Sequence, residues 1–346
     1  MINFLKAYIK RWFTFNLIET MEPILERYYN KRTQYLEKLH LEELQYQYGL
    51  VSKLSGNQCL IKTCFGHYLV VPSYNLDVAI GGMRDGMIEP WTTAVVSSIL
   101  KPGDKYINVG ANFGYYSVLG ASLVQNSGKV YAIEANPEAF VYLVLSCYWS
   151  GYINIIESYN FAAYHKNNEP INITFNPQYL GGAGIFPPGS KNVRASTEEC
   201  LWTGLNIQEN LNAERKFSPE IIFKFNSFIV PGYTLDHILS DVEDVKLLHM
   251  DVEGSESFVI GGAKNLIRRS PRINLIIEWD PKHNYDTQRK PFVDDMWTFL
   301  LEEMQLTPYR IEPENYSEIG QLPNLSELNK ESLFNIPHSD ILLKKT

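Results

Sequence analysis

The sequence predicts an α/β fold in which a parallel sheet is covered by helices on both of its faces. From about residue 105 onward, short apolar runs typical of buried strands alternate with longer runs that have helical periodicity. Apolar residues make up 45% of the 346 residues and charged residues 20%, which is the composition of a globular protein with a large core. We expect strands at 106–109, 130–134, 153–156, 245–250 and 273–277, and helices at 114–125, 137–150, 255–268 and 292–304.

Residues 1–50 are expected to form a separate helical extension. Their apolar side chains recur at helical spacing, as at Leu17, Met21, Leu25 and Tyr28. Aromatic residues beside lysines near the start would also suit a helix on a membrane surface. Packing against the protein itself or against a second subunit is favoured, so a homodimer formed through these helices is one expected assembly.

Residues 51–95 are expected to form a small cap of strands and loops before the main domain, which spans 96–346. Two short strands are predicted around a turn at Gly66. An insertion at about 171–230 interrupts the alternation of strands and helices, as functional insertions often do. Its glycine- and proline-rich part, 176–190, is expected to lack regular structure and to form a mobile flap. A surface connection without ligand contact is the alternative.

The charge and cysteine content argue against several classes of protein. The chain has 31 basic and 39 acidic residues and a formal net charge of −8, which argues against a broad nucleic-acid-binding surface. The four cysteines form no CxxC pair and no spacing typical of a zinc site, so no metal is expected. We find no signal peptide and no apolar run of the roughly 20 residues that span a membrane. These features predict a cytoplasmic protein with free thiols and no transmembrane segment.

The segment INVGANFGYYS, residues 107–117, is the strongest indication of a ligand site. A buried strand is expected to end at Gly110 and a helix to begin near Gly114, which leaves free backbone N–H groups at a tight turn. The next strand ends in Glu134, 20 residues after Gly114, where a carboxylate can accept hydrogen bonds from ribose hydroxyls. The dinucleotide fingerprint needs glycines that are missing here, for example at Asn112, so a cofactor without phosphate, such as S-adenosylmethionine, fits better than NAD. A tight turn with an incidental acid is the alternative.

Four segments of the chain, INVGANFGYYS, VYAIEANP, KLLHMDVEGSESFVIGGAKNLI and INLIIEW, follow one another in a distinctive order and spacing. Over roughly residues 85–345 the chain resembles the FkbM family of S-adenosylmethionine-dependent methyltransferases. The resemblance implies a class I methyltransferase fold (Rossmann-like), with a seven-stranded, mostly parallel sheet flanked by helices. It also implies S-adenosyl-L-methionine as the cofactor and S-adenosyl-L-homocysteine as the product. The family's best-known members methylate hydroxyls of polyketides and sugars, and others resemble enzymes that methylate peptide amide nitrogens.

The resemblance places the cofactor against residues that follow the first three strands and against one residue upstream of them. The implied cofactor-binding residues are Glu89, Asn108, Gly110, Ala111, Asn112, Gly114, Glu134, Asn160, Phe161 and Ala162. Glu134 would hold the ribose diol, residues 160–162 would line the adenine, and Glu89 would lie near the amino-acid end. Asn108 stands where the family usually has Asp; its amide can still accept from the methionine ammonium but attracts the charge less strongly.

The fourth predicted strand ends at Met250 and is followed by the acidic segment DVEGSE. Ligand sites in such sheets lie beyond the carboxyl ends of the strands, so these acids are expected beside the methyl acceptor. The predicted catalytic residues are Asp251, Glu253 and His249, with Asp251 the first choice for acceptor binding or proton removal. Helix capping is the alternative for the acids, and a place in the core is the alternative for His249, which stands where the family usually has Lys. Glu278, at the end of the fifth strand, is a further candidate.

On this resemblance, the expected reaction is methylation of a hydroxyl on a sugar, glycan or secondary metabolite. N-methylation of a peptide side-chain amide is the closest alternative, so the expected acceptor is a small molecule, glycan or peptide rather than a nucleic acid. Two alternatives from other classes are a nicotinamide-dependent oxidoreductase and a catalytically silent methyltransferase fold that acts as a scaffold. The departures at Asn108 and His249 keep the scaffold alternative open, and binding of S-adenosylhomocysteine would distinguish these interpretations.

Overall fold

The computed structural model describes residues 51–54, 57–75, 86–176, 179–186, 226–281, 289–315 and 321–345. All of them belong to one compact unit, Gly49–Thr346. The expected helical extension at 1–50 and the middle of the insertion lie outside the described residues. None of the described helices is both long and apolar enough to cross a membrane.

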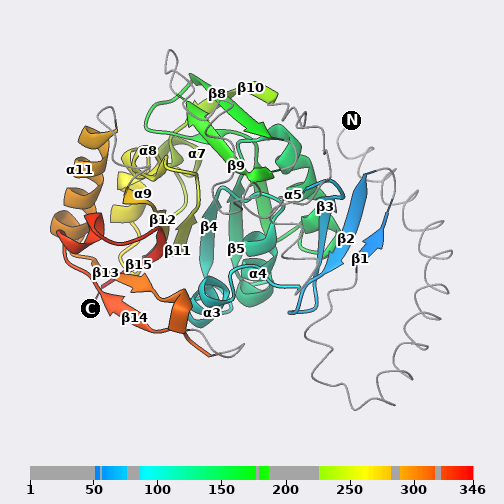
Figure 1. Ribbon diagram of the computed structural model, residues 1–346, viewed down its shortest axis with the longest axis horizontal. Helices are drawn as coiled ribbons and strands as arrows, with labels where there is room; N and C mark the ends of the chain where they lie inside the picture. Colours follow the sequence, from blue (N-terminus) through cyan, green and yellow to red (C-terminus); the bar gives the residue numbers. More distant parts are fainter. Residues whose placement is uncertain are drawn as a thin grey trace, which may run out of the picture. The chain divides into compact units, whose positions relative to one another are not determined.

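An eight-stranded sheet forms the centre of this unit, with the strand order β14-β13-β15-β12-β11-β4-β5-β6 (Figure 1). Five strands are parallel: β4 (Lys105–Val109), β5 (Lys129–Ile133), β6 (Ile156–Tyr159), β11 (Val245–Met250) and β12 (Asn274–Trp279). Three are antiparallel to their neighbours: β15 (Ser339–Lys344), β13 (Thr307–Ile311) and β14 (Leu325–Glu327). Without the three-residue edge strand β14, this is the predicted seven-stranded, mostly parallel sheet of a class I methyltransferase fold.

Two apolar cores cover the two faces of the sheet, because side chains alternate between faces along each strand. Tyr106 and Leu247 belong to the core that also contains residues of α3 (Pro90–Ile99), α4 (Tyr115–Val124) and α5 (Pro137–Trp149). Leu248 and Met250 belong to the core built with α7 (Leu235–Ile238), α8 (Glu256–Gly261), α9 (Lys264–Arg268) and α11 (Lys290–Thr298). The prediction of helices on both faces is therefore confirmed.

Several element boundaries differ from the predicted ones. The helix expected at 255–268 is divided into α8 and α9 at Gly262, where an added Cβ would lie 2.1 Å from the Tyr164 carbonyl oxygen. The helix expected at 292–304 begins at Lys290 and continues beyond α11 as a π-helical turn, Phe299–Glu303. The strand expected at 153–156 begins only at Ile156, because the residues before it form a hydrogen-bonded turn after α5.

The insertion forms a second sheet with the strand order β7-β10-β8-β9. Its strands are β7 (Ala162–Ala163), β8 (Glu169–Asn176), β9 (Tyr179–Phe186) and β10 (Asn226–Tyr233). The prediction that 176–190 lacks regular structure is wrong for β9, which pairs antiparallel with β8. Backbone hydrogen bonds from β8 stabilise this glycine-rich strand, and composition alone does not reveal such a partner. Residues 187–190 lie outside the described residues.

A three-stranded antiparallel sheet precedes the main sheet, with β1 (Val51–Lys53), β2 (Gln58–Lys62) and β3 (Tyr68–Pro72). The two strands predicted around Gly66 are β2 and β3. The sheet is tied to α5, since the Ser146 hydroxyl accepts a hydrogen bond from the Val70 N–H at 2.9 Å. This sheet thus extends the core formed by α3, α4 and α5.

Candidate active site

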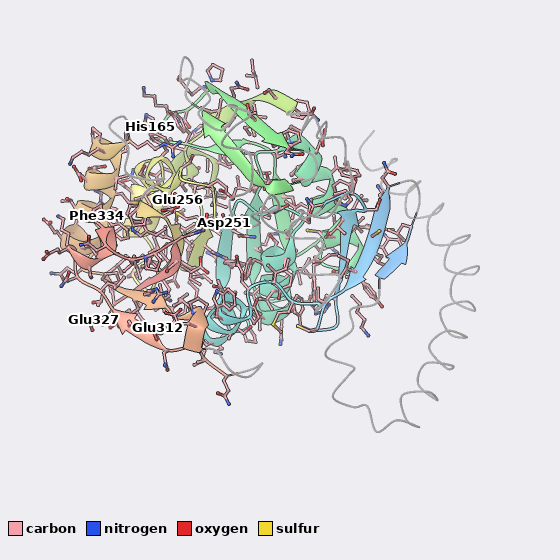
Figure 2. All side chains as sticks on the ribbon, viewed as in Figure 1. His165, Asp251, Glu256, Glu312, Glu327 and Phe334 are labelled. Atoms are coloured by element: carbon pink, nitrogen blue, oxygen red, sulfur yellow. The ribbon has the colours of Figure 1, made fainter. Side chains whose placement is uncertain are left out.

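A cavity opens beyond the carboxyl ends of β4, β5 and β11. It lies where the strand order turns, since β5 follows β4 on one side and β11 flanks β4 on the other, and ligands bind at such points in open α/β sheets. Figure 2 shows Asp251, which lines it, at this end of the sheet. The described residues that line the cavity are Val109, Gly110, Asn112, Ile133, Glu134, Ala135, Asn136, Phe161, Ala163, Ile173, Asp251, Val252 and Glu253.

The turn after β4 brings two strand ends into direct contact. Gly110 has a φ of 77°, and a Cβ at this position would lie 1.8 Å from the Asp251 carbonyl oxygen. The N–H groups of Gly110 and Ala111 both donate to the Ile133 carbonyl, at 2.9 and 3.0 Å. Gly114, with a φ of 92°, begins α4. Only glycine permits this approach at residue 110. The turn therefore fixes the distance between the side of the cavity that carries Glu134, the Glu134 wall, and the side that carries Asp251 and Glu253, the Asp251 wall.

Glu134 follows β5 and is held by two backbone donors. The Asn112 N–H donates to its Oε2 and the Asn136 N–H to its Oε1, both at 2.7 Å. The side chain is buried, and this burial raises the pKa of Glu134 to about 7 although the backbone donors act against the shift. The carboxylate is therefore oriented at the cavity wall before any ligand binds.

The remaining predicted cofactor residues fall into two groups. Phe161 lines the cavity together with Gly110, Asn112 and Glu134. The others are not among the described lining residues, and several of them support the wall from behind. Asn160 donates to the Glu134 carbonyl at 2.8 Å, Asn108 donates to the Ser117 hydroxyl at 2.9 Å, and Ala162 pairs with β10. Ala111 and Gly114 are buried within the turn.

Glu89 precedes α3 and lies outside the cavity lining as described. Its backbone is in the left-handed region, with a φ of 41°, and its Oε2 accepts a hydrogen bond from the Tyr116 hydroxyl at 2.7 Å. The Glu89 carboxylate also contributes to raising the pKa of Asp251, so it faces the acidic side of the site.

Three carboxylates converge on the opposite wall. Asp251 follows β11, Glu253 lies two residues later, and Glu278 is on the neighbouring strand β12; their oxygens lie within 4.8 Å of one another. Asp251 and Glu278 are hydrogen bonded, which requires a proton on one of them. Desolvation raises the pKa of Asp251 well above its usual range, and the carboxylates of Glu278 and Glu253 raise it further. Burial, with the Glu253 charge, also raises the pKa of Glu278 to about 9.

The same three carboxylates are, in the part of the chain that the structure describes, the group whose spacing could admit a metal ion. A cluster of acids does not by itself identify such a site, and we assign none. Glu278 has a partner on the outside of the cluster, because its Oε1 lies 2.8 Å from Nε2 of the exposed His338. The residues that could hold an adenosyl cofactor are those of the Glu134 wall.

The loop that carries Asp251 and Glu253 is held in a fixed conformation. Glu253 and Gly254 have φ values of 53° and 85°. Glu256 Oε1 accepts hydrogen bonds from the N–H groups of Val252 and Gly254, each at 3.2 Å. Arg289 Nη1 donates to the Gly254 carbonyl at 2.6 Å. Ser255, not Asp251, occupies the N-cap of α8, so the helix-capping alternative does not describe Asp251.

His249 is buried on the core side of β11. It is 3% exposed, its Nδ1 lies 3.2 Å from the Tyr106 hydroxyl, and its ring is edge-on to Tyr116 with a centroid distance of 4.5 Å. Burial lowers the pKa of His249 to about 3, so the ring is neutral. His249 is not among the described residues that line the cavity. The structure therefore does not bring it together with Asp251 and Glu253.

Sequence reasoning missed seven of the described residues that line the cavity, namely Val109, Ile133, Ala135, Asn136, Ala163, Ile173 and Val252. Asn136 lines it beside Glu134, and the only sequence signal was its place between a strand-end acid and the helix-starting Pro137. Ile173 lines it from β8, which means that the insertion contributes to the cavity wall. No pattern within the insertion pointed to that contact.

Comparison with known proteins identifies the family. Residues 108–306 match the model of the methyltransferase FkbM domain. A 57-residue segment is 42% identical to protein-L-isoaspartate O-methyltransferase of Aeropyrum pernix; the match covers 16% of this chain and 22% of that relative, about a fifth of its length.

Solved structures give weaker similarities. Precorrin-6y C5,15-methyltransferase from Geobacter metallireducens is 12% identical over 73% of this chain and 88% of that chain, with a TM-score of 0.31. Aeropyrum pernix fibrillarin with natively bound S-adenosyl-L-methionine is 10% identical over 86% and 99%, with a TM-score of 0.35. The family model, by contrast, spans more than half of the sequence. The chain belongs to the FkbM family of S-adenosylmethionine-dependent methyltransferases.

Proposed function

We propose that the protein transfers a methyl group from S-adenosylmethionine to a hydroxyl of a sugar, glycan or secondary metabolite. The observation that carries this proposal is a single cavity with two unlike walls. One wall presents the oriented carboxylate of Glu134, and the other presents Asp251 and Glu253. The Gly110 turn joins the two walls, and this arrangement suits a cofactor and an acceptor that must meet.

The Glu134 wall is the proposed cofactor side. Glu134 would accept hydrogen bonds from the ribose hydroxyls, and Phe161 would contact the adenine. The amino-acid end would lie beside the Gly110 turn, next to Asn112, since both residues line the cavity. Ala111, Gly114, Asn108, Asn160 and Ala162 would shape this wall through the turn and the strand ends, and Glu89 would act from the side of α3.

The Asp251 wall is the proposed acceptor side. The bound cofactor supplies an electrophilic methyl group, and an acceptor hydroxyl that attacks it must lose its proton. Desolvation and neighbouring carboxylates raise the pKa of Asp251 and Glu278, so these carboxyls hold protons at neutral pH, and Asp251 is a strong base only after it has lost its own proton. In that ionised form Asp251 would take the proton of the acceptor, and Glu253 would orient the hydroxyl. His249 has no part in this proposal because it faces the core.

Two assays test the proposal. We expect wild-type protein to bind S-adenosylhomocysteine in a calorimetric titration and Glu134→Ala to bind it more weakly by about 1–3 kcal/mol, because charge-assisted hydrogen bonds are lost. Glu157→Gln, a change of an exposed glutamate on β6, is the matched control and should leave the affinity unchanged. Absence of binding by the wild type would refute the proposal and leave the alternatives without a methyl donor, above all the scaffold.

The second assay follows an isotopically labelled methyl group from S-adenosylmethionine into a cell extract by mass spectrometry. Asp251→Asn should reduce the incorporated label strongly while the affinity for S-adenosylhomocysteine stays within a few-fold of wild type. Asp241→Asn, a change in an exposed turn, controls for the loss of a negative charge. Equal losses of affinity and incorporation in Asp251→Asn would assign Asp251 to structure, and label found only on amide nitrogen would refute hydroxyl methylation.

A further inference from the structure

Asn136 carries a buried amide N–H that makes no hydrogen bond with the residues that the structure describes. Its side chain is 1% exposed and lines the cavity beside Glu134. Its Oδ1 accepts a hydrogen bond from the Glu138 N–H at 2.9 Å and so caps α5. Its Nδ2 is buried and has no hydrogen-bond partner among the residues that the structure describes.

An unpaired amide N–H in such a position indicates a missing partner. Native proteins pair nearly all buried polar groups, and an unpaired one calls for a specific explanation. The helix cap already fixes Oδ1, so the amide cannot rotate to pair its N–H without losing the cap. A ligand that fills the cavity can supply the acceptor, with a small shift of the cavity wall because Nδ2 is buried in the unbound protein.

The location of Asn136 indicates which part of a ligand it would meet. Its backbone N–H donates to Glu134 Oε1 at 2.7 Å and both residues line the cavity, so Asn136 belongs to the part of the cavity that would receive the ribose. On the other side of the carboxylate, Asn112 donates its N–H to Oε2, and its own Oδ1 is also buried without a partner in the described part of the chain. Each of the two residues whose backbone holds the carboxylate therefore has one unused side-chain amide atom.

We propose that Asn136 Nδ2 donates a hydrogen bond to a ribose hydroxyl oxygen of the adenosyl cofactor and that this donor makes the site selective for a ribonucleoside. The inference rests on the proposed function. A hydroxyl has one proton to give and lone pairs to receive. The ionised carboxylate of Glu134 can only accept, so it uses the proton, and Asn136 supplies the donor that the hydroxyl oxygen lacks. The unused acceptor of Asn112 suits the proton of the second hydroxyl.

The test separates two roles of the Asn136 side chain: the hydrogen-bond donor Nδ2 that would meet the ligand, and the acceptor Oδ1 that caps α5. Serine is a good N-cap and keeps the acceptor, but it has no amide N–H, whereas alanine loses both. Calorimetry would measure the dissociation constants of S-adenosylhomocysteine and of its 2′-deoxy and 3′-deoxy analogues for the wild type, Asn136→Ser and Asn136→Ala. Asn154→Ser, a change of an exposed asparagine in the turn after α5, is the matched control.

We expect Asn136→Ser to weaken binding of S-adenosylhomocysteine by roughly 3- to 10-fold with little change in melting temperature. One deoxy analogue should bind the wild type and Asn136→Ser equally well, because it lacks the contacted hydroxyl. Asn136→Ala should show the same loss of affinity and a lower melting temperature as well. Asn154→Ser should match the wild type in every measurement.

Three outcomes would overturn the inference. Asn136→Ser could bind S-adenosylhomocysteine as tightly as wild type, Asn136→Ala could lose only thermal stability, or Asn136→Ser could lose the same factor with both deoxy analogues. The first two would leave Asn136 as a helix cap, and the third would remove the contact with a hydroxyl. Failure of the proposed function gives a different result, namely a wild type that does not bind S-adenosylhomocysteine.

Discussion

Single residues set the geometry of the cavity, and Gly110 is the clearest case. Its backbone has a positive φ, and the missing side chain allows the Asp251 carbonyl to approach. An added Cβ would therefore lower the stability of the fold in two ways: through the strain of a left-handed L residue and through a steric clash with the Asp251 backbone.

Replacement of Gly110 by alanine should be much more costly than the same change elsewhere. We expect Gly110→Ala to lower the free energy of unfolding by about 2–4 kcal/mol, since strain and clash add. Gly66 has a φ of 89° and nothing within 4 Å of an added Cβ, so Gly66→Ala isolates the strain and should cost roughly 1 kcal/mol. Urea unfolding of both variants checks this, and equal losses would show that the contact with Asp251 is unimportant.

The sequence predicted the site residues whose chemistry depends on a strand end. Glu134 follows a buried strand, and its place at the cavity follows from the topology of a parallel sheet. The surroundings of His249 could not be predicted in the same way. Alternation places it opposite Met250, but only the packed structure shows that its face meets Tyr106 and Tyr116 rather than the cavity. The unused donor of Asn136 likewise becomes visible only when the cap on α5 is known.

At the scale of elements, the loop between β11 and α8 connects the sheet to the Asp251 wall, the proposed acceptor side. It carries Asp251 and Glu253, and Glu256 in the first turn of α8 accepts hydrogen bonds from Val252 and Gly254, the residues on either side of the left-handed Glu253. Glu256 is buried, and this burial raises its pKa to about 7. The Glu256 carboxylate thus fixes the conformation of the loop, although Glu256 is not among the described residues that line the cavity.

Truncation of Glu256 should loosen this loop. We expect Glu256→Ala to lower the free energy of unfolding by about 2–4 kcal/mol, because two backbone N–H groups lose their acceptor. Glu256→Gln keeps an oxygen for those donors and should cost less. The affinity for S-adenosylhomocysteine should change little in either variant, since the Glu134 wall is separate. Denaturation and calorimetry measure both effects, and a loss of affinity larger than the loss of methyl transfer would contradict the assignment.

The elements themselves were predicted where a local signal was strong. Pro137 and its preceding asparagine mark the start of α5, and Gly110 marks the end of β4. The strand β9 was missed because its glycines give no apolar pattern. Its hydrogen bonds come from β8, and no rule based on the local sequence predicts that pairing. The division between α8 and α9 depends on the Tyr164 carbonyl, another tertiary contact.

At the scale of the whole molecule, the fold buries several ionisable groups of the site away from water. Burial raises the pKa of Glu134 and Glu256 to about 7 and that of Glu278 to about 9. These carboxyls bind protons more tightly in the folded chain than in the unfolded chain. Their contribution to stability is present in full below about pH 4.5 and is lost as the pH rises through 7 and toward 9. His249 acts oppositely, since its pKa of about 3 makes stability rise with pH up to about 6.5.

Stability should therefore decline from about pH 4.5, because one histidine offsets only one of the three carboxyls, and more steeply above about pH 6.5, where the histidine no longer contributes. Glu134→Gln removes one of these groups, so between pH 5 and pH 8 the free energy of unfolding should shift in favour of the variant by on the order of 1–3 kcal/mol relative to wild type. Glu157→Gln is the control. The hydrogen bond from Lys129 lowers the pKa of Glu157, so the contribution of Glu157 to the free energy of unfolding stays constant between pH 5 and pH 8. Urea unfolding followed by tryptophan fluorescence at several pH values measures the difference. Parallel curves for wild type and Glu134→Gln would show that Glu134 ionises freely in the folded protein and would remove the physical basis for an oriented, desolvated carboxylate at the cofactor wall.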